Sequence, residues 1–155
     1  MPKIKFNIVE VVVFRTANDP EFLVLRRSDD DDIYPGLWQI VSGGIRRGEK
    51  AYCAAVREIE EEIGIKPSRV FNTPLTNTFY VWTTDSVNVS PVLAAEVNCD
   101  AVVKLSEEHQ EFRWLRKEQA ISLLIWPGQR EAIEVVDEYI LRDNPSRKFM
   151  EIKIR

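Results

Sequence analysis

The sequence predicts a single α+β domain in which helices cover a β-sheet. Its 155 residues match the common size of one domain with one proper core. Several segments are rich in Ile, Val and Phe with partial alternation, which is typical of strands. Residues 49–63 and 129–142 carry helix formers and an apolar stripe, which indicates amphipathic helices, the second of them closing over the sheet.

Composition argues against several classes of function. The net charge is −4 and no strongly basic block is present, so a duplex nucleic acid or an anionic membrane surface is not expected as a partner. Cys53 and Cys99 form neither a paired-ligand spacing nor a disulfide framework, which favours a reducing compartment. The N-terminus lacks a secretory signal and no segment reads as a membrane span. We therefore expect a cytoplasmic protein without a membrane or stable nucleic-acid partner.

The first third of the chain is predicted to form a hairpin and a short third strand. Residues 3–15 read as a strand with a buried centre, and an Asn-Asp-Pro turn connects it to a second strand at 21–27. The acidic run 29–32 is expected to be a solvated loop, with a metal or substrate role as the alternative. Residues 38–41 are expected to form a short strand.

Residues 49–63 are predicted to carry the chemistry. Neither Pro nor Gly interrupts this helix, and a glycine follows it where a left-handed cap belongs. At about 100° per residue, Glu58, Glu61 and Glu62 share an arc of about 100°, and the remaining glutamate of the run points to the opposite side. Such crowding costs a few tenths of a kcal/mol per pair, so it is tolerated without a ligand and does not define a site by itself.

The surroundings of these carboxylates favour a metal site. Three alanines are expected on the same strip, where they leave room for a ligand: Ala51, Ala54 and Ala55. A separate apolar stripe is expected to face the core: Tyr52, Val56, Ile59 and Ile63. Hard divalent cations bind carboxylate oxygens, waters and substrate phosphates, which suits Mg²⁺. Gly43 and Gly44 precede the helix and allow a ligand to approach the backbone closely.

This segment fits the pattern G-x5-E-x7-R-E-U-x-E-E-x-G-U, in which U is apolar, at every fixed position. Those positions are Gly43, Glu49, Arg57, Glu58, Ile59, Glu61, Glu62, Gly64 and Ile65. So many matches in one window argue against chance, and the chain resembles the Nudix hydrolase family. Pro35, Gly36 and Trp38 also keep the family's P-G-x-W pattern, whereas Ser42 replaces the proline that many relatives carry before the paired glycines.

The resemblance implies a fold, a cofactor and site residues. The fold is an α/β/α sandwich, in which a mixed sheet is packed between helices. The cofactor is Mg²⁺, with Mn²⁺ as a substitute, and the helix glutamates are its expected ligands. Arg57 is expected to pair with Glu49 and to orient the carboxylates. One of Arg26 and Arg27 is expected to contact substrate phosphates, with a surface ion pair to the nearby aspartates as the equal alternative.

A second segment resembles nucleoside-triphosphate and dihydroneopterin-triphosphate enzymes of the family. It reads E-H-x-x-x-x-W, with Glu108, His109 and Trp114 at the fixed positions. In such relatives a loop glutamate reaches the metals, which makes Glu108 a candidate ligand or base, with Glu107 as its competitor. The general base stays open among Glu61, Glu62 and Glu108. His109 could titrate near neutrality, but a lone loop histidine is more often structural or solvated.

The middle of the chain is predicted to contribute two paired strands. Residues 66–74 are expected to connect, with a short strand at their centre, before a strand at 78–84. Its partner is expected at 92–97, across a turn at 85–91. Three aromatic side chains of this region could stack on a base, but core packing is the favoured interpretation: Phe79, Tyr80 and Trp82.

The last part of the chain is predicted to be mostly helical. Helices are expected at 117–124 and 129–142, and residues 112–115 and 149–154 are expected to be strands. Trp126 lies at the junction of the helices, where a core anchor is favoured over a pocket wall. A basic tail follows, interpreted as a solvated face.

The resemblance extends to the substrate. The segments E-H-x-x-x-x-W and W-P-G-Q-R-E-A-I look most like pyrophosphohydrolases of (d)NTPs, including dATP, and of dihydroneopterin triphosphate. ADP-ribose, dinucleoside polyphosphates and nucleotide sugars are the alternative substrates. A catalytically silent nucleotide-binding regulatory module is the alternative of another class, although the motif keeps every carboxylate. A small nucleotide or pterin triphosphate is thus the expected partner, and the resemblance leaves a homodimer open.

Overall fold

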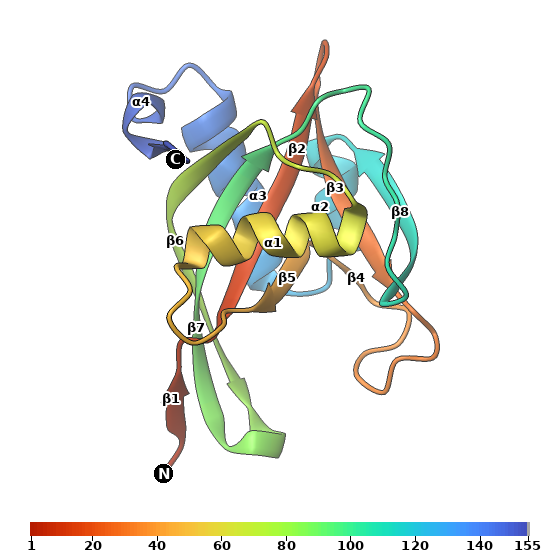
Figure 1. Cartoon of the computed structure of the whole chain (residues 1–155), viewed down its shortest axis with the longest axis vertical. Coiled ribbons are helices and arrows are strands. Elements are labelled where there is room, and N and C mark those ends of the chain that lie inside the picture. Colours follow the sequence, from red (N-terminus) through yellow and green to blue (C-terminus); the bar gives the residue numbers. More distant parts are fainter. Residues whose placement is uncertain (155) are drawn as a thin grey trace.

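The computed structural model describes residues 1–154 and confirms the α+β class (Figure 1). Nine strands form one sheet: β1 Lys3–Lys5, β2 Ile8–Thr16, β3 Pro20–Arg27, β4 Trp38–Gln39, β5 Val41–Gly44, β6 Arg69–Val81, β7 Ser86–Glu96, β8 His109–Leu115 and β9 Glu151–Ile152. The helices are α1 Ala51–Ile63, α2 Lys117–Leu123, α3 Pro127–Val136 and α4 Arg147–Met150, with a 3₁₀ turn η1 at Trp82–Thr84 and a π-helical turn η2 at Asp137–Leu141.

The sheet is mixed, and its centre is β2 beside β7. The strand order is β4-β3-β2-β7-β6-β9, with β1 paired to β7, β5 to β2 and β8 to β3. The pairs β2·β7 and β1·β7 are parallel, and the other pairs are antiparallel. β4 pairs with part of β3, and β5 pairs with part of β2. The chain between β4 and β5 therefore passes from one strand of the β2–β3 hairpin to the other.

Two cores lie on the two faces of this sheet. Side chains of a strand alternate between faces, and β2 shows this directly: Val9, Val11 and Val13 pack in the cluster that contains α1. Val12 and Phe14 pack in the other cluster, with the apolar residues of α2 and α3. The sheet is therefore covered by α1 on one face and by α2 and α3 on the other, as the sandwich prediction required.

The strands at the N-terminal end are more broken than predicted. Residues 3–15 form two strands, because the chain leaves the ladder at Phe6 and Asn7, and the Asn7 carbonyl instead accepts the Ile45 N–H at 2.8 Å. Residues 38–41 also divide into two strands. Ile40 lies between them, and its N–H donates to Gln129 Oε1 at 3.3 Å rather than to a strand.

The prediction for the β6–β7 hairpin was wrong in its boundaries. Residues 69–81 form one long strand, and residues 86–91, predicted as a turn, already belong to β7. The chain reverses in the 3₁₀ turn and at Asp85, whose φ is 43°. This part of β7 was not predicted as a strand because its buried side chains are polar, namely Ser86, Asn88 and Ser90. A half-buried strand normally buries its apolar residues.

The predicted core packing of three aromatic residues was also wrong. Phe79, Tyr80 and Trp82 are exposed, since they lie where the hairpin projects past the body of the molecule (Figure 1). Alternating aromatic residues in a strand are buried only if a second layer covers the strand. Helix α1 does not extend over the part of the hairpin that carries these residues (Figure 1).

The C-terminal elements were predicted with different bounds. The expected helix 129–142 begins at Pro127 and changes to the π-helical turn at Asp137. The expected strand 149–154 is reduced to β9, which pairs with Val70 and Phe71 of β6, because residues 147–150 form the short helix α4. None of the helices within residues 1–154 combines the length and apolar character that crossing a membrane requires.

Candidate active site

Helix α1 begins after Lys50 and ends at Gly64, whose φ of 68° is left-handed, as predicted. Its predicted apolar stripe does face the core, with Ile59 and Ile63 fully buried and Tyr52 and Val56 packed against them, but the prediction for the alanines was wrong. Ala54 and Ala55 are fully buried in the core with Ile59 and Ile63, so they do not leave room for a ligand. Small side chains at these positions instead let the helix axis approach the sheet closely.

The three predicted glutamates differ sharply in exposure. Glu61 is exposed, Glu58 is half-buried, and Glu62 is buried. The Glu62 Oε2 atom has no hydrogen-bond partner. Burial, followed by the charges of Glu108 and Glu58, raises the pKa of Glu62 to about 9. A buried, unpartnered carboxylate oxygen is costly, so this position is suited to a bound cation.

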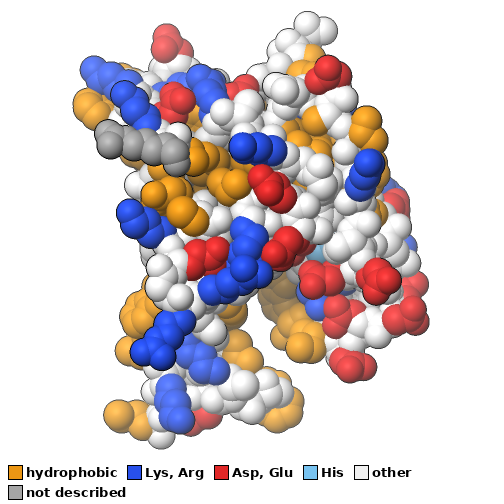
Figure 2. All heavy atoms as spheres, viewed as in Figure 1, with side chains coloured by type: hydrophobic (Ala, Val, Ile, Leu, Met, Phe, Trp, Pro, Cys, Tyr) orange, Lys and Arg blue, Asp and Glu red, His pale blue; other side chains and the backbone are white. Residues whose placement is uncertain are grey.

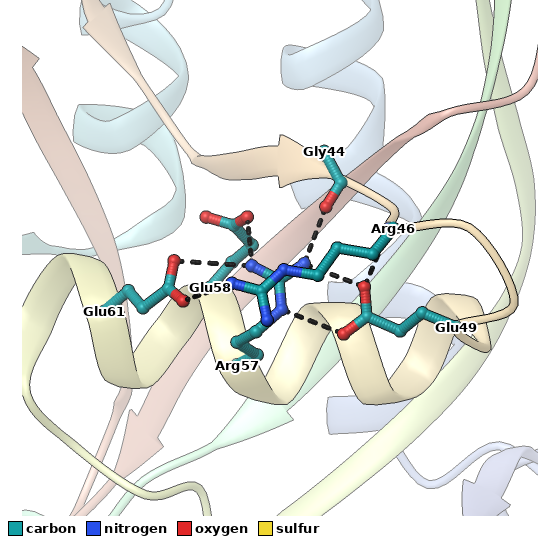
Figure 3. Close-up of polar contacts among 6 residues, drawn as sticks. All are labelled: Gly44, Arg46, Glu49, Arg57, Glu58 and Glu61. Atoms are coloured by element: carbon teal, nitrogen blue, oxygen red, sulfur yellow. Dashed lines mark hydrogen bonds and ion pairs between the residues drawn. The ribbon is translucent and has the colours of Figure 1, made fainter.

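Arg57 connects the helix to the preceding loop (Figure 3). Its guanidinium donates to both oxygens of Glu49 at 2.8 Å, and to the Gly44 carbonyl at 2.7 Å. It also donates to Glu58 Oε1 at 2.8 Å and to Glu61 Oε2 at 3.3 Å. Hydrogen bonds from Arg57 lower the pKa of Glu49 to about 2. The pairing expected between Arg57 and Glu49 is therefore present.

Gly43 makes room for the Glu58 carboxylate. A Cβ atom at position 43 would overlap the carboxylate carbon and both oxygens of Glu58. At Gly44 the same addition would meet only the Asn7 carbonyl, at 3.8 Å. The requirement for glycine at position 43 is thus steric.

Glu108 lies on the loop that faces α1. Its charge, like that of Glu61, raises the pKa of Glu58, after the larger effect of burial. A cleft of about 240 Å³ lies beside it, lined by Ser28, Asp30, Asp31, Glu107 and Glu108. The structure therefore brings Glu108 near Glu58 and Glu62, and it places the predicted competitor Glu107 on the same cleft.

The two candidate phosphate arginines are engaged with the acidic loop, defined as residues 28–37. Arg27 forms an ion pair with Asp31 and donates to the Ile33 carbonyl at 2.8 Å. Arg26 donates to the Gly36 carbonyl at 3.3 Å and has Glu111 at 3.6 Å. In this arrangement both side chains order the loop, which corresponds to the ion-pair alternative.

His109 is buried rather than solvated. Its Nε2 lies 2.9 Å from Gln39 Nε2, and its Nδ1 has no partner. Burial lowers its pKa to about 4, so it is neutral at pH 7.

The carboxylates fit a divalent cation only with rearrangement. Within residues 1–154, no three His, Cys, Asp or Glu side chains already form a ready-made metal cage. The reason is visible in Figure 3, where Arg57 holds Glu58 and Glu61. Oxygen donors of this kind are what Mg²⁺ takes, and the unpartnered Glu62 oxygen supplies one that no other group satisfies.

A buried polar cluster was missed in the sequence. Glu10, the one charged residue in the apolar segment of β2, accepts from Asn77 Nδ2 at 2.7 Å, and the polar side chains of Gln129 and Ser90 lie close to it. Burial raises its pKa. The signal was available, because a glutamate inside an apolar strand must have buried partners.

Two aromatic residues stand near this cluster. Tyr34 of the acidic loop meets Trp126 edge to face, with ring centroids 5.3 Å apart. The Trp126 carbonyl accepts the Gln129 N–H at 3.1 Å, which connects the aromatic pair to the polar cluster. Trp126 is partly exposed, so the favoured interpretation as a core anchor was wrong.

The buried Glu62 predicts a pH effect on stability in metal-free protein. The unfolded chain loses this proton near its ordinary pKa of 4.5, whereas the folded protein keeps it up to about 9. The contribution of Glu62 to the free energy of unfolding is therefore greatest below pH 4.5, and it decreases as the pH rises toward 9. Urea denaturation in EDTA between pH 7 and 9 measures the slope, above both the folded pKa of His109, about 4, and its ordinary value of 6.5.

Glu62→Gln is the matched variant for this measurement, because it keeps the shape and removes the titration. We expect it to flatten the slope between pH 7 and 9. A wild-type slope equal to that of the variant would show that Glu62 is already ionised in the metal-free protein.

Comparisons with known proteins point to one family. The NUDIX domain matches residues 7–138. The chain is 29% identical over 111 residues to the nucleoside triphosphatase NudI of Escherichia coli K12, covering 67% of this chain and 79% of that protein. A NUDIX hydrolase structure from Listeria monocytogenes has a TM-score of 0.75 at 26% identity and covers 96% of this chain and 100% of its own. The E. coli dihydroneopterin triphosphate pyrophosphohydrolase has a TM-score of 0.69 at 23% identity, covering 85% and 98%.

Proposed function

The chain belongs to the Nudix family of pyrophosphohydrolases, and on this premise we propose that it hydrolyses a (d)NTP or dihydroneopterin triphosphate with release of pyrophosphate. The observation that carries the proposal is the set of carboxylates around the unpartnered Glu62 oxygen, with Glu58 set against Gly43 and Glu108 facing them. Mg²⁺, or Mn²⁺ in its place, would neutralise the phosphates and activate water when bound there.

In this proposal Glu58, Glu61, Glu62 and Glu108 hold the metal. Arg57 positions two of them, since its guanidinium already contacts Glu58 and Glu61 while Glu49 anchors it. Partners of this kind fix the orientation of metal-binding groups. Gly43 and Gly44 let phosphate oxygens approach the loop closely. Arg26 and Arg27 reach the phosphates only if the substrate displaces their contacts in the acidic loop.

The reaction itself is a displacement at phosphorus. A water oxygen forms the new P–O bond, the bond to the bridging oxygen breaks, and pyrophosphate departs with the electron pair. One glutamate takes the proton of the water. Glu61, Glu62 and Glu108 are the candidates, and Glu62 qualifies as a base only after a cation lowers its pKa, because it holds its own proton at pH 7 in the metal-free protein.

The ring of the substrate is proposed to lie against Trp126. Bases and pterins stack on aromatic side chains, and the buried cluster of Glu10, Asn77 and Gln129 would supply hydrogen-bonding groups next to it. The named relative NudI, a nucleoside triphosphatase, supports the triphosphate class. The dihydroneopterin triphosphate enzyme shares the fold and adds its own substrate to the compounds worth assaying.

The test is chromatographic analysis of the hydrolysis products formed with Mg²⁺ from (d)NTPs, dihydroneopterin triphosphate, ADP-ribose, a nucleotide sugar and a dinucleoside polyphosphate, because only the triphosphates release pyrophosphate. We expect a triphosphate to be the best substrate by kcat/KM. Preference for ADP-ribose, a nucleotide sugar or a dinucleoside polyphosphate would select the alternative substrates. Tight binding without turnover across the panel would identify a regulatory module instead.

Trp126→Ala is expected to raise KM about 10-fold or more with a smaller change in kcat. Stacking of a base on an aromatic ring contributes about 1–3 kcal/mol, and this contribution acts on substrate binding more than on the bond being broken. Steady-state kinetics on the best substrate measure the split. Phe149→Ala is the control, because Phe149 is equally aromatic and is exposed on α4. A Trp126→Ala enzyme with unchanged KM would remove Trp126 from the ring site.

A further inference from the structure

Arg46 is an arginine that the proposed mechanism does not use, although its side chain reaches the carboxylates of α1. It lies on the loop between β5 and α1, at a position that the family pattern leaves variable. Its backbone is fixed, because its N–H donates to Glu49 Oε2 at 2.9 Å and its carbonyl accepts the Glu49 N–H at 3.0 Å. Its Nη2 donates to Glu61 Oε1 at 3.4 Å (Figure 3). The loop thus places a second guanidinium group, besides that of Arg57, on a proposed metal ligand.

The two guanidinium groups at Glu61 differ in how firmly they are held. The Arg57 side chain is 18% exposed, and it keeps Glu49 and the Gly44 carbonyl as partners even without Glu61. The Arg46 side chain is 67% exposed, and Glu61 is the only acidic side chain within residues 1–154 that pairs with it. An exposed ion pair of this kind stabilises a protein very little. Arg46 can therefore leave Glu61 easily, while Arg57 stays in place.

The phosphates of a substrate need a positively charged side chain beside the metal. Arg26 and Arg27 are held by backbone carbonyls and carboxylates around the acidic loop, so they become free only when that loop changes. Figure 2 shows basic side chains over the middle of α1 with acidic side chains on both sides of them, and the surface is hollowed directly below. A guanidinium presents its donors in a planar fork that matches phosphate oxygens. Arg46 can offer this fork without any change in the fold.

We propose that Arg46 exchanges partners during binding: it pairs with Glu61 in the empty enzyme, and with a substrate phosphate once Glu61 turns to the bound cation. The inference rests on the proposed function, because it takes Glu61 as a metal ligand and a polyphosphate as the substrate. No covalent bond forms or breaks in the exchange. The guanidinium has an anionic partner in both states.

This exchange couples the binding of the cation to the binding of the phosphates. In the empty enzyme Arg46 opposes cation binding, because it occupies an oxygen of Glu61 and adds a positive charge beside it. A bound phosphate removes this opposition by taking the guanidinium. Arg46 therefore adds to the direct attraction between cation and phosphate, and linkage requires each ligand to strengthen the binding of the other by the same factor.

The test measures two affinities of the full chain by titration calorimetry, that for Mn²⁺ alone and that for tripolyphosphate at saturating Mn²⁺. Tripolyphosphate carries no ring, so the ring site does not influence the result. Arg46→Gln should tighten Mn²⁺ binding about 2- to 5-fold, because an exposed ion pair no longer competes for Glu61. The same variant should bind tripolyphosphate about 10-fold or more weakly, because charge-assisted hydrogen bonds to phosphate are lost. A purely structural residue would weaken both affinities.

Arg47→Gln is the matched control, because it removes the same charge from the same loop. Arg47 is exposed, whereas the ion pairs of Glu61 are those with Arg46 and Arg57. We expect Arg47→Gln to change each affinity less than about 2-fold. Arg46→Lys keeps the charge without the fork, so it should recover part of the tripolyphosphate affinity. Equal effects of Arg46→Gln and Arg47→Gln would overturn the proposal, since the net charge of the loop would then explain them.

A double-mutant cycle with Glu61→Gln tests the contact itself. Combined with Glu61→Gln, Arg46→Gln should no longer tighten Mn²⁺ binding, because no carboxylate remains at position 61 for the guanidinium to occupy. Equal tightening with and without Glu61→Gln would overturn the exchange. Thermal unfolding of each variant verifies the fold, and tighter Mn²⁺ binding cannot come from an unfolded chain.

The same measurements separate this inference from the proposed function. If the wild type binds both Mn²⁺ and tripolyphosphate while Arg46→Gln changes neither affinity, the exchange is wrong and the proposed metal site stands. If the wild type binds neither, the proposed function is wrong and the exchange with it.

Discussion

Glu61→Gln combined with Glu62→Gln is expected to lower kcat/KM for pyrophosphate release by at least about 10³-fold. A bound cation contributes several kcal/mol to transition-state stabilisation, and about 1.4 kcal/mol corresponds to a factor of ten. The double variant removes one exposed and one buried carboxylate from the same site. Kinetics with saturating Mg²⁺ measure the loss, and a Mg²⁺ titration separates weaker metal binding from slower turnover.

The stability of this double variant should not fall. Glu62 is buried and has its pKa raised to about 9, so an amide in its place removes a group that is costly to ionise. Glu60→Gln is the matched control, because Glu60 is exposed on the other side of the same helix. Turnover that survives the double substitution would remove the site assignment, while an equal loss in Glu60→Gln would point to damage to the helix.

Gly43→Ala is expected to reduce kcat/KM about 10²-fold. The new methyl group occupies the space of the Glu58 carboxylate, which must swing away and lose its contact with Arg57. A displacement of about 1 Å in a reacting arrangement can cost about 10²-fold. The obstructing atoms are the far end of a flexible side chain, so the fold should tolerate the change. Thermal unfolding and steady-state kinetics measure the two effects.

Gly44→Ala provides a close control for this experiment. A Cβ atom at the next glycine would make only an ordinary contact, with the Asn7 carbonyl at 3.8 Å, and the interaction of this glycine with Arg57 uses the backbone carbonyl, which alanine retains. We expect a smaller loss than in Gly43→Ala, because the methyl group narrows the approach of the phosphates but leaves the Glu58 carboxylate and its contact with Arg57 in place. Equal losses in the two variants would mean that flexibility of the loop, rather than the space for Glu58, is what matters.

The helix and its C-terminal end could be predicted from the sequence because the information is local, although the helix begins at Ala51 rather than at residue 49. Residues 49–63 contain no breaker, and Gly64 adopts the expected left-handed cap. The register of the carboxylates on the helix also follows from the sequence alone. Their burial does not, because it depends on which face packs against the sheet. Ala54 and Ala55 were therefore assigned to the wrong surroundings, and Glu62 was expected beside them in the open.

Long-range features explain the other errors. Glu10 meets Asn77 across 67 positions of the chain, so its partner is invisible to any local pattern. The exposed aromatic residues at the tip of the β6–β7 hairpin were predicted to be buried because their alternation is that of a covered strand. Whether a second layer covers these residues depends on where α1 ends in space. The division of residues 38–41 into β4 and β5 likewise depends on Gln129, which lies in a distant helix.

The loop that carries Glu108 is tied to the end of α1 before any ligand arrives. The Glu62 carbonyl accepts the Ser106 N–H at 3.1 Å, and the Ile63 carbonyl accepts the Lys104 N–H at 2.9 Å. These are carbonyls that the last turn of a helix leaves without internal partners. The conformational entropy of that segment is therefore lost already during folding. Cation binding then requires only that side chains reorient.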